Sequence, residues 1–424
     1  MKRVGNLFDK VVDPDNLRLA FWKASRRKRL RDDQRQFQLH LNHELACLRD
    51  GLLSATYPIG DYRRFTIYDP KEREICAASF GERVLQHAIM NVCEPFFDRW
   101  LIYDSYACRK GKGQVAAVKR AREFAGRHEW FMKCDFRKYF DSIPHDRLKA
   151  MLRRRFKDPY LVDWFNRIVD SYEKTLGRGL PIGSLTSQHF ANFYLDPLDR
   201  LLTQRCRGLK IGYVRYMDDF VFWANDKEEL LALRREVVGF VEGELGLVLK
   251  REPFINCTRR GMDFLGMRIF PKAVRLGRTS RVRYRRKIKA YRRAFEQGEW
   301  SEAEYQSRIT ALTAFTELAD ALVWRRKILA DCEEHRAITE CCVAAAGTTT
   351  RGTAAPLTAK GTSLATVTAT TASASVAPQR RRTIRTAPAV GPFPSNAGTN
   401  NTRRVGASSV AESSDTSLFQ GHRK

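Results

Sequence analysis

Apolar residues recur at helical spacing in several stretches of the chain, and these stretches predict helices. In the first, apolar residues from Leu17 to Ala24 follow Asp13-Pro14, a pair typical of a helix start. Further helices are expected at residues 80–98, after Ser142-Ile143-Pro144, at about 227–245, from Val282 to Arg293, and from the capping box at 301–304. The helix from Val282 is expected to carry basic residues on every face.

Three shorter apolar stretches predict strands. Trp130 to Asp135 has the composition of a buried strand. Gly212 to Trp223 has the pattern of two short strands joined at Met217-Asp218-Asp219, and another strand is expected around Phe264 to Ile269. Helices mixed with a few short strands indicate an α+β fold around a small antiparallel sheet.

The composition changes sharply near residue 346. Residues 347–424 hold only two aromatic residues, Phe393 and Phe419, among many Thr, Ala, Ser, Gly and Pro residues. A segment with so few apolar anchors cannot offset the entropy that is lost on ordering. We therefore predict a disordered, basic, low-complexity tail over residues 347–424.

Basic residues outnumber acidic ones by 76 to 48, which gives a formal net charge of +28. Ten Lys and Arg residues against Glu412 and Asp415 put about +8 of this charge in the tail and leave about +20 on residues 1–346. So large an excess attracts polyanions and makes nucleic acid the leading partner class.

The sequence shows no sign of a membrane or secretory segment. No apolar run approaches the roughly 18 to 20 residues of a membrane span, and no signal-peptide core follows residues 1–5. The ten cysteines form no C-x-x-C pair and no cluster with histidine at zinc spacing. We expect a soluble, cytoplasmic protein with free thiols, although the adjacent Cys341 and Cys342 could bind a metal or oxidise.

Two adjacent carboxylates occur in Tyr216-Met217-Asp218-Asp219, between two apolar half-strands. Neighbouring carboxylates repel one another, so the pair indicates a counter-cation, and Mg²⁺ prefers oxygen ligands of this kind. Asp is also a favoured turn residue, but solvation gives no reason for an Asp-Asp turn inside an aromatic hairpin. Asp135, at the end of an apolar strand, is either a third ligand or a helix-capping residue, since an unpaired charge there would be costly.

Several ordered motifs resemble those of reverse transcriptases. Asp135 with Phe140 five residues later, followed about 80 residues on by the Tyr-Met-Asp-Asp hairpin, resembles motifs A and C of the reverse transcriptase palm. Residues 179–195 resemble motif B. Retroviral and group II intron enzymes carry Gln-Gly near the start of this motif, whereas the I-G-x-x-x-S-Q form of residues 182–188 resembles the enzymes of diversity-generating retroelements.

The resemblance extends from about residue 10 to 330 and implies a right-hand polymerase fold. It implies an N-terminal segment with the fingers at 1–125, a palm with part of the fingers at 126–272, a helical thumb at 273–346 and the tail at 347–424.

The resemblance also implies a two-metal site. It assigns catalysis to Asp135, Asp218 and Asp219, and metal binding to these three residues and Phe136. Two Mg²⁺ ions, with Mn²⁺ as a substitute, would activate the primer 3′-hydroxyl and stabilise the leaving pyrophosphate. Lys250 matches a lysine that protonates pyrophosphate in the family, and Arg251 competes for that role.

Other roles implied by the resemblance concern the nucleotide and the primer–template. Nucleotide binding is assigned to Lys71, Arg73, Phe140, Ile182 and Gln188, with Phe140 as the steric gate against a 2′-hydroxyl. Lys71 and Arg73 match triphosphate-binding residues, but either could be solvated surface. Primer or template binding is assigned to Arg109, Tyr216, Gly266, Arg285 and Arg286. Tyr216 could equally be a core aromatic, and the basic helix could be exposed surface.

The tail permits a second interpretation in its coding sequence. Gly347-Thr348-Thr349-Thr350 is encoded by GGN-ACN-ACN-ACN. With a T before these codons and A in the third positions, the frame one base earlier reads TGG-AAC-AAC-AAC, and residues 361–376 permit a similar asparagine-rich frame. AAC-rich coding resembles the template repeat of a diversity-generating retroelement. The tail would then be that repeat read out of frame; the rivals are a basic RNA-binding tail and an ordinary low-complexity extension.

We therefore predict an RNA-directed DNA polymerase that copies a template-repeat RNA into cDNA, with errors opposite adenine. The implied partners are template RNA, the RNA/cDNA duplex, dNTPs, a small basic accessory protein and a hypervariable target protein, in a prokaryotic or phage-encoded system. The alternatives are a retron-type or defence-associated reverse transcriptase and a non-catalytic RNA-binding protein on a polymerase fold. The presence of all three aspartates favours an enzyme.

Overall fold

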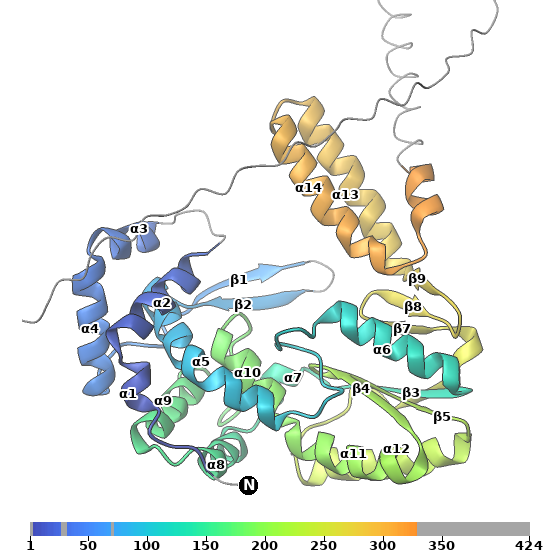
Figure 1. Ribbon diagram of the computed structural model, residues 1–424, viewed down its shortest axis with the longest axis horizontal. Coiled ribbons are helices and arrows are strands. Elements are labelled where there is room, and N and C mark those ends of the chain that lie inside the picture. Colours follow the sequence, from blue (N-terminus) through green and yellow to red (C-terminus); the bar gives the residue numbers. More distant parts are fainter. Residues whose placement is uncertain (1–2, 27–31, 69–71, 329–424) are drawn as a thin grey trace, which may run out of the picture. The chain divides into compact units, whose positions relative to one another are not determined.

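The computed structural model describes residues 3–26, 32–68 and 72–328 (Figure 1). Lys71, Cys332, Cys341, Cys342 and the tail at 347–424 lie outside the described residues. All cysteines within the described ranges are free thiols. None of the helices in these ranges combines the length and apolar character of a membrane span.

Helices dominate the N-terminal part of the fold. These are α1 (Phe8–Val11), α2 (Pro14–Ser25), α3 (Asp32–Leu39) and α4 (Leu41–Leu53), all of which contact the long helix α5 (Phe80–Trp100). The first predicted helix is confirmed as α2, because the Asp13 side chain accepts hydrogen bonds from the N–H groups of Asp15 and Asn16. Between α4 and α5, β1 (Arg63–Ile67) and β2 (Arg73–Ala77) form an antiparallel hairpin.

A four-stranded antiparallel sheet of order β4-β5-β3-β6 forms the centre of the fold, as predicted. Its strands are β3 (Trp130–Asp135), β4 (Gly212–Tyr216), β5 (Asp219–Ala224) and β6 (Phe254–Cys257). Only Met217 and Asp218 separate β4 from β5, and Met217 has a left-handed backbone with φ +56°.

Different elements cover the two faces of this sheet, which explains why its strands are apolar on both sides. Phe220 and Phe222 of β5 face the main core, which includes α11 and α12, whereas Val221 and Trp223 face a second core with α6 (Figure 1). The helices of this region are α6 (Gln114–Arg127), α7 (Tyr139–Ser142), α8 (His145–Arg155), α9 (Pro159–Asp170), α10 (Leu185–Tyr194), α11 (Asp196–Leu209) and α12 (Lys227–Gly243).

The second core continues into a three-stranded antiparallel sheet. The 3₁₀ helix η1 (Thr258–Arg260) precedes β7 (Met262–Phe264), β8 (Met267–Ile269) and β9 (Val274–Leu276). The single strand predicted around Phe264 to Ile269 is therefore wrong. Leu265 and Gly266, with φ of +49° and +79°, turn the chain back between β7 and β8.

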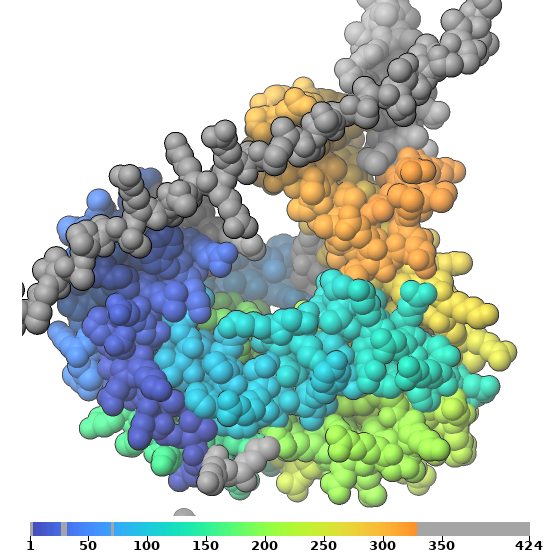
Figure 2. Space-filling model, in the orientation of Figure 1, coloured from blue at the N-terminus to red at the C-terminus, as the bar shows by residue number. Residues whose placement is uncertain are grey.

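The described chain ends in α13 (Arg278–Glu296), α14 (Glu302–Ala314) and η2 (Phe315–Leu318). The predicted capping box is present, since the Ser301 side chain accepts a hydrogen bond from the Glu304 N–H. In Figure 2 the face shown is hollowed between the N-terminal helices, in blue, and the C-terminal helices, in orange.

The expectation of basic residues on every face of α13 is wrong. Tyr284 and Ile288, one turn apart, are buried together with Ile328. The Arg285 guanidinium lies 5.8 Å from the centre of the Trp324 ring. One apolar stripe therefore anchors α13, and its basic residues occupy the remaining faces.

Candidate active site

The three aspartates predicted to be catalytic lie at adjoining ends of two paired strands. Asp135 is the last residue of β3 and Asp219 is the first of β5, and the two are directly opposed in the antiparallel register. Asp218 occupies the turn immediately before β5. Opposed residues in such a pair have Cβ atoms about 4.5–5.5 Å apart. The backbone therefore brings the three aspartates to adjoining positions.

The carboxylate of Asp219 is buried and only partly paired. Its Oδ2 accepts a hydrogen bond from Lys133 Nζ at 3.0 Å, whereas its Oδ1 is shielded from solvent and has no hydrogen-bond partner among the described residues. The pKa of Asp219 is raised to about 6, mainly by burial and also by the charges of Asp218 and Asp135, although Lys133 lowers it. A buried oxygen without a partner is costly, so this oxygen is suited to receive a cation.

Lys250 lies beside Asp135, as the role of proton donor requires. Its backbone N–H donates to the Asp135 carbonyl at 2.8 Å, and its Nζ is 3.6 Å from Asp135 Oδ2. Both side chains keep about two fifths of their surface exposed, at 43% and 41%. Arg251, the competing candidate, is exposed. Lys250 therefore contacts the carboxylate site.

The donor atoms of this site fit a hard divalent cation. Lys133 and Lys250 balance part of the negative charge, and among the described residues no three His, Cys, Asp or Glu side chains are gathered into a ready metal cluster. Carboxylate oxygens, one of them an unpartnered buried atom, are nevertheless ligands that Mg²⁺ prefers. Phe136 could offer only its backbone carbonyl, because its ring packs between Tyr139 and Phe220.

The residues predicted to contact the nucleotide come from segments that backbone hydrogen bonds tie together. The Cys76 N–H of β2 donates to the Ile182 carbonyl at 2.8 Å. The Leu180 N–H donates to the Phe140 carbonyl at 2.9 Å. Phe140, on α7, and Ile182, before α10, are therefore linked to β2, whose first residue is the exposed Arg73.

Gln188 lies on the first half of α10 and contacts a loop that precedes the central sheet. Its Oε1 accepts from the Cys108 thiol at 3.5 Å. Burial raises the pKa of that thiol to about 11, so Cys108 stays protonated and acts as a weak donor. The loop around Cys108 therefore supports the side chain predicted to lie beside the nascent base pair.

The Arg109 guanidinium turns inward, toward Asp98 and the loop that precedes Arg109. Its Nε bonds to the Asp98 carboxylate at 2.6 Å, and its Nη1 donates to the carbonyls of Ile102 and Ser105 at 2.5 and 2.9 Å. Only 9% of the side chain is exposed. These hydrogen bonds give Arg109 a structural role, in which it braces the loop of residues 102–109, and the predicted template contact stays a prediction.

The other residues predicted to bind primer or template remain placed for such a role. Tyr216 is half-buried against the second core, which keeps the core alternative open. Gly266 accepts a hydrogen bond from the Gly277 N–H at 3.0 Å, and a Cβ there would lie 2.8 Å from Ser280 Oγ, so the turn requires glycine. Arg285 and Arg286 are exposed on α13.

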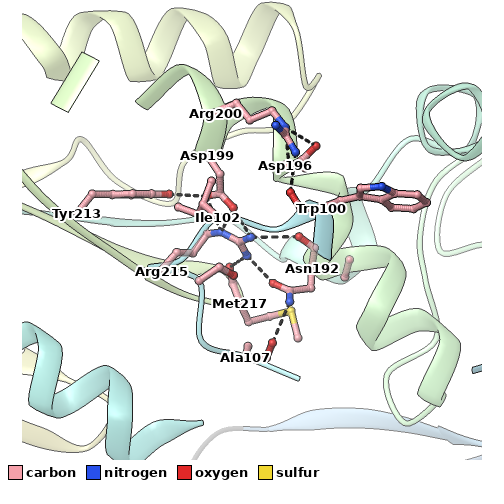
Figure 3. Close-up of polar contacts among 12 residues, drawn as sticks. Trp100, Ile102, Ala107, Asn192, Asp196, Asp199, Arg200, Tyr213, Arg215 and Met217 are labelled. Carbon is pink, nitrogen blue, oxygen red and sulfur yellow. Dashed lines mark hydrogen bonds and ion pairs between the residues drawn. The ribbon is translucent and has the colours of Figure 1, made fainter. Parts of the chain in front are cut away.

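Two polar features of the site are not evident from the motifs. Arg215 of β4 is fully buried and paired with Asp199 (Figure 3). Lys133 of β3 donates a hydrogen bond to Asp219. The signal that could have found both is a charged residue inside an apolar strand, because a buried charge needs a partner.

Asp219→Asn is expected to stabilise the metal-free protein at alkaline pH. Folding raises the pKa of Asp219 from 3.8 to about 6, so protonation of this carboxyl group stabilises the folded state. The stabilisation is complete below about pH 4 and is lost as the pH rises through about 6. Asparagine is uncharged and still accepts from Lys133, so at pH 8 the free energy of unfolding should rise by at most about 3 kcal/mol. Denaturant titrations with EDTA at pH 8, 6 and 4 should show this gain shrinking to zero. A loss of stability at pH 8 would contradict it.

Comparison with known proteins finds a matching family model and similar proteins. Residues 69–269 match the family model described as reverse transcriptase (RNA-dependent DNA polymerase). Protein YkfC of Escherichia coli is 27% identical over 291 residues, covering 57% of this chain and 74% of YkfC. Group II intron-encoded protein LtrA of Lactococcus lactis is 26% identical over 147 residues, covering 32% of this chain but only 23% of LtrA.

Solved structures similar to this fold include apo telomerase from Candida tropicalis. The TM-score is 0.41 at 11% identity, and the match covers 63% of this chain and 66% of the telomerase chain.

Proposed function

We propose, from the match of residues 69–269 to the reverse transcriptase family model, that the whole chain is an RNA-directed DNA polymerase. The observation that carries the proposal is the opposed pair of Asp135 and Asp219 with Asp218 in the adjoining turn. This arrangement places three carboxylates where two apolar strands end, which suits phosphoryl transfer assisted by divalent cations.

The residues of the site would divide the work of nucleotide addition. Asp135 and Asp218 would hold the divalent cations, which when bound supply the positive charge that activates the 3′-hydroxyl and stabilises pyrophosphate. Asp219 would add negative charge to the site, while the hydrogen bond from Lys133 holds its carboxylate in place. Lys250, 3.6 Å from Asp135, would give its proton to the leaving pyrophosphate. Phe140 would exclude a 2′-hydroxyl.

Primer extension tests the proposed activity directly. The full chain, an RNA template, an annealed DNA primer, dNTPs and Mg²⁺ or Mn²⁺ should yield extended DNA whose sequence follows the template. Omitting the template or adding EDTA should abolish the product. Tight binding of the same duplex with no extension under either metal would instead favour the non-catalytic RNA-binding protein.

Within reverse transcriptases we infer the diversity-generating subtype. The I-G-x-x-x-S-Q form of residues 182–188 supports it and disfavours the retron-type and defence-associated alternatives. The permitted AAC-rich frame at residues 347–350 supports it independently of the enzyme motifs. The subtype brings with it a template-repeat RNA, a small basic accessory protein and a hypervariable target protein as partners.

The subtype is tested by the DNA that encodes residues 340–424 and its neighbourhood. An A-rich segment there, repeated in an adjacent gene with differences at adenines only, is the expected finding. Sequenced cDNA should also carry most of its errors opposite template adenines. A coding sequence without such a repeat, together with errors spread evenly over the four bases, would overturn the subtype but leave the polymerase activity intact.

Removing two exposed charges from α13 should weaken duplex binding in a salt-dependent way. Arg285→Gln/Arg286→Gln is expected to lower the slope of log affinity against log salt concentration by about 2, because each lost phosphate contact removes about one unit. Fluorescence anisotropy on an RNA/DNA duplex between 50 and 300 mM salt measures this slope. Arg153→Gln/Arg154→Gln, the same charge change on exposed positions of α8, is the matched control. Equal slopes for both pairs would contradict a special role for α13.

A further inference from the structure

A buried polar cluster contacts the turn between β4 and β5 through the Met217 carbonyl (Figure 3). It consists of Arg215 from β4, Asn192 from α10 and Asp199 from α11, and we call it the hairpin anchor. The side chains of Arg215 and Asp199 have no exposed surface, and Asn192 is 2% exposed. The reaction assigned above uses none of these three residues.

The hairpin anchor uses all five N–H donors of the Arg215 guanidinium. Nε donates to Asp199 Oδ1 at 2.8 Å, and Nη2 donates to Asp199 Oδ2 at 2.5 Å and to the Asn192 carbonyl at 3.2 Å. Nη1 donates to Asn192 Oδ1 at 2.7 Å and to the Met217 carbonyl at 2.9 Å. One planar group therefore joins two helices to the turn that carries Asp218.

The Met217 carbonyl is the point where this support is most needed. Met217 has a left-handed backbone, with φ +56°, which a residue with a side chain adopts only at an energetic cost. The hydrogen bond from Arg215 holds the turn in that conformation. Because Asp218 follows Met217 in a turn of two residues, a shift of this carbonyl would also move the Asp218 carboxylate.

The hairpin anchor also reaches the loop beside the predicted nucleotide pocket. Asn192 Nδ2 donates to the Ala107 carbonyl at 2.8 Å, and Ala107 precedes Cys108, the contact of Gln188. The backbone of Arg215 is held from the same loop, because its N–H donates to the Asp104 carbonyl at 2.9 Å. The hairpin and the loop therefore share one support.

A buried ion pair is weak evidence for stability, since desolvation of the two charges offsets most of their attraction. The Arg215–Asp199 pair is better explained as a device that fixes the geometry of the turn, because a bidentate guanidinium fixes the direction of its hydrogen bonds as well as their length. We propose that Arg215 is a positioning residue: through Met217 it sets the place of the Asp218 carboxylate relative to Asp135. This role rests on the proposed polymerase function.

Arg215→Lys tests the proposal, and Arg155→Lys is the matched control. Both substitutions keep the positive charge but remove the fork of an arginine that bonds to a buried aspartate on α11, since Arg155 Nη2 is 2.8 Å from Asp196 Oδ2. Only the Arg215 fork contacts the hairpin. The measurements are the thermal midpoint, duplex affinity in EDTA, KM for dNTP, and kcat per active site from burst titration.

Arg215→Lys is expected to lower kcat per active site by about 10- to 100-fold, the effect of a small misplacement of reacting groups. Its KM and duplex affinity should stay within about twofold of wild type, and Arg155→Lys should stay within about twofold in every measurement. If Arg215→Lys does not fold, Asn192→Ala decides, because it keeps the Arg215–Asp199 pair and removes one support of the guanidinium. It should lower kcat in the same way.

Each contrary outcome has a distinct meaning. The wild type could be active while Arg215→Lys, or Asn192→Ala in its place, has the same kcat per active site as Arg155→Lys. That result would overturn the positioning role alone. A smaller fraction of active protein with an unchanged kcat per active site would also overturn the positioning role. A wild type that extends no primer would overturn the proposed function and the positioning role with it.

Discussion

Asp218→Asn is expected to reduce primer extension by at least about 1,000-fold. In the proposed mechanism Asp218 holds a divalent cation, so its loss removes several kcal/mol of charge stabilisation in the transition state, and about 4 kcal/mol corresponds to a thousandfold in rate. Asparagine is as favourable as aspartate in a turn, so the hairpin between β4 and β5 should keep its fold. The measurement is single-turnover extension at saturating dNTP, with duplex affinity determined in parallel.

Asp226→Asn is the control for the loss of one negative charge near the same strand. Asp226 caps α12 by accepting from the Glu228 N–H, and asparagine is an equally good cap. It should leave extension unchanged. If Asp218→Asn retained activity within tenfold of Asp226→Asn, the assignment of the metal site to the hairpin would be wrong.

Phe140→Ala is expected to raise the incorporation of ribonucleotides relative to deoxyribonucleotides by about 10- to 200-fold. That range is typical of discrimination in which a pocket excludes one small group. The ring of Phe140 meets Tyr139 edge to face at 5.8 Å, and the Tyr139 hydroxyl donates to the Ala191 carbonyl on α10 at 2.5 Å. The ring of Phe140 is therefore braced, through Tyr139, from α10. The ratio of kcat/KM for CTP and dCTP measures the effect.

Phe254→Ala provides the comparison for loss of a phenyl ring. Phe254 lies on β6 of the same sheet and is 57% exposed. Its removal should leave the preference for deoxyribonucleotides unchanged. An unchanged preference in Phe140→Ala would place the gate elsewhere.

The sequence patterns predicted the central sheet, and the places of Asp135 and Asp219 at its strand ends, because both have local signals. β3 and β5 are short and apolar on both faces, and Asp135 and Asp219 stand where the apolar runs end. The β7–β8 hairpin could not be predicted in the same way. Its turn contains Leu265 in the left-handed region, an unusual turn residue, so the run looked like one continuous strand.

Side-chain directions and distant partners were the part that the sequence could not supply. Arg109 belongs to a recognisable motif, yet its guanidinium turns inward to Asp98. Arg215 finds Asp199 and Asn192, which are 16 and 23 residues away along the chain and lie on two different helices. Such pairings depend on tertiary packing, and a pattern of apolar and polar positions carries no information about them.

The hairpin anchor restricts the paths by which this chain can evolve. Replacing Arg215 alone would deprive buried acceptors of Asp199 and Asn192 of a donor, and replacing Asp199 or Asn192 alone would leave buried N–H donors of Arg215 unpaired. Breaking a buried ion pair costs about 3–5 kcal/mol. Replacing all of them with well-packed apolar residues could be nearly neutral for stability. Single substitutions in the trio are therefore destabilising, whereas a simultaneous replacement of all three need not be. Descendants of this sequence should keep the trio intact or lose it together, and they should inherit the geometry of the catalytic turn with it.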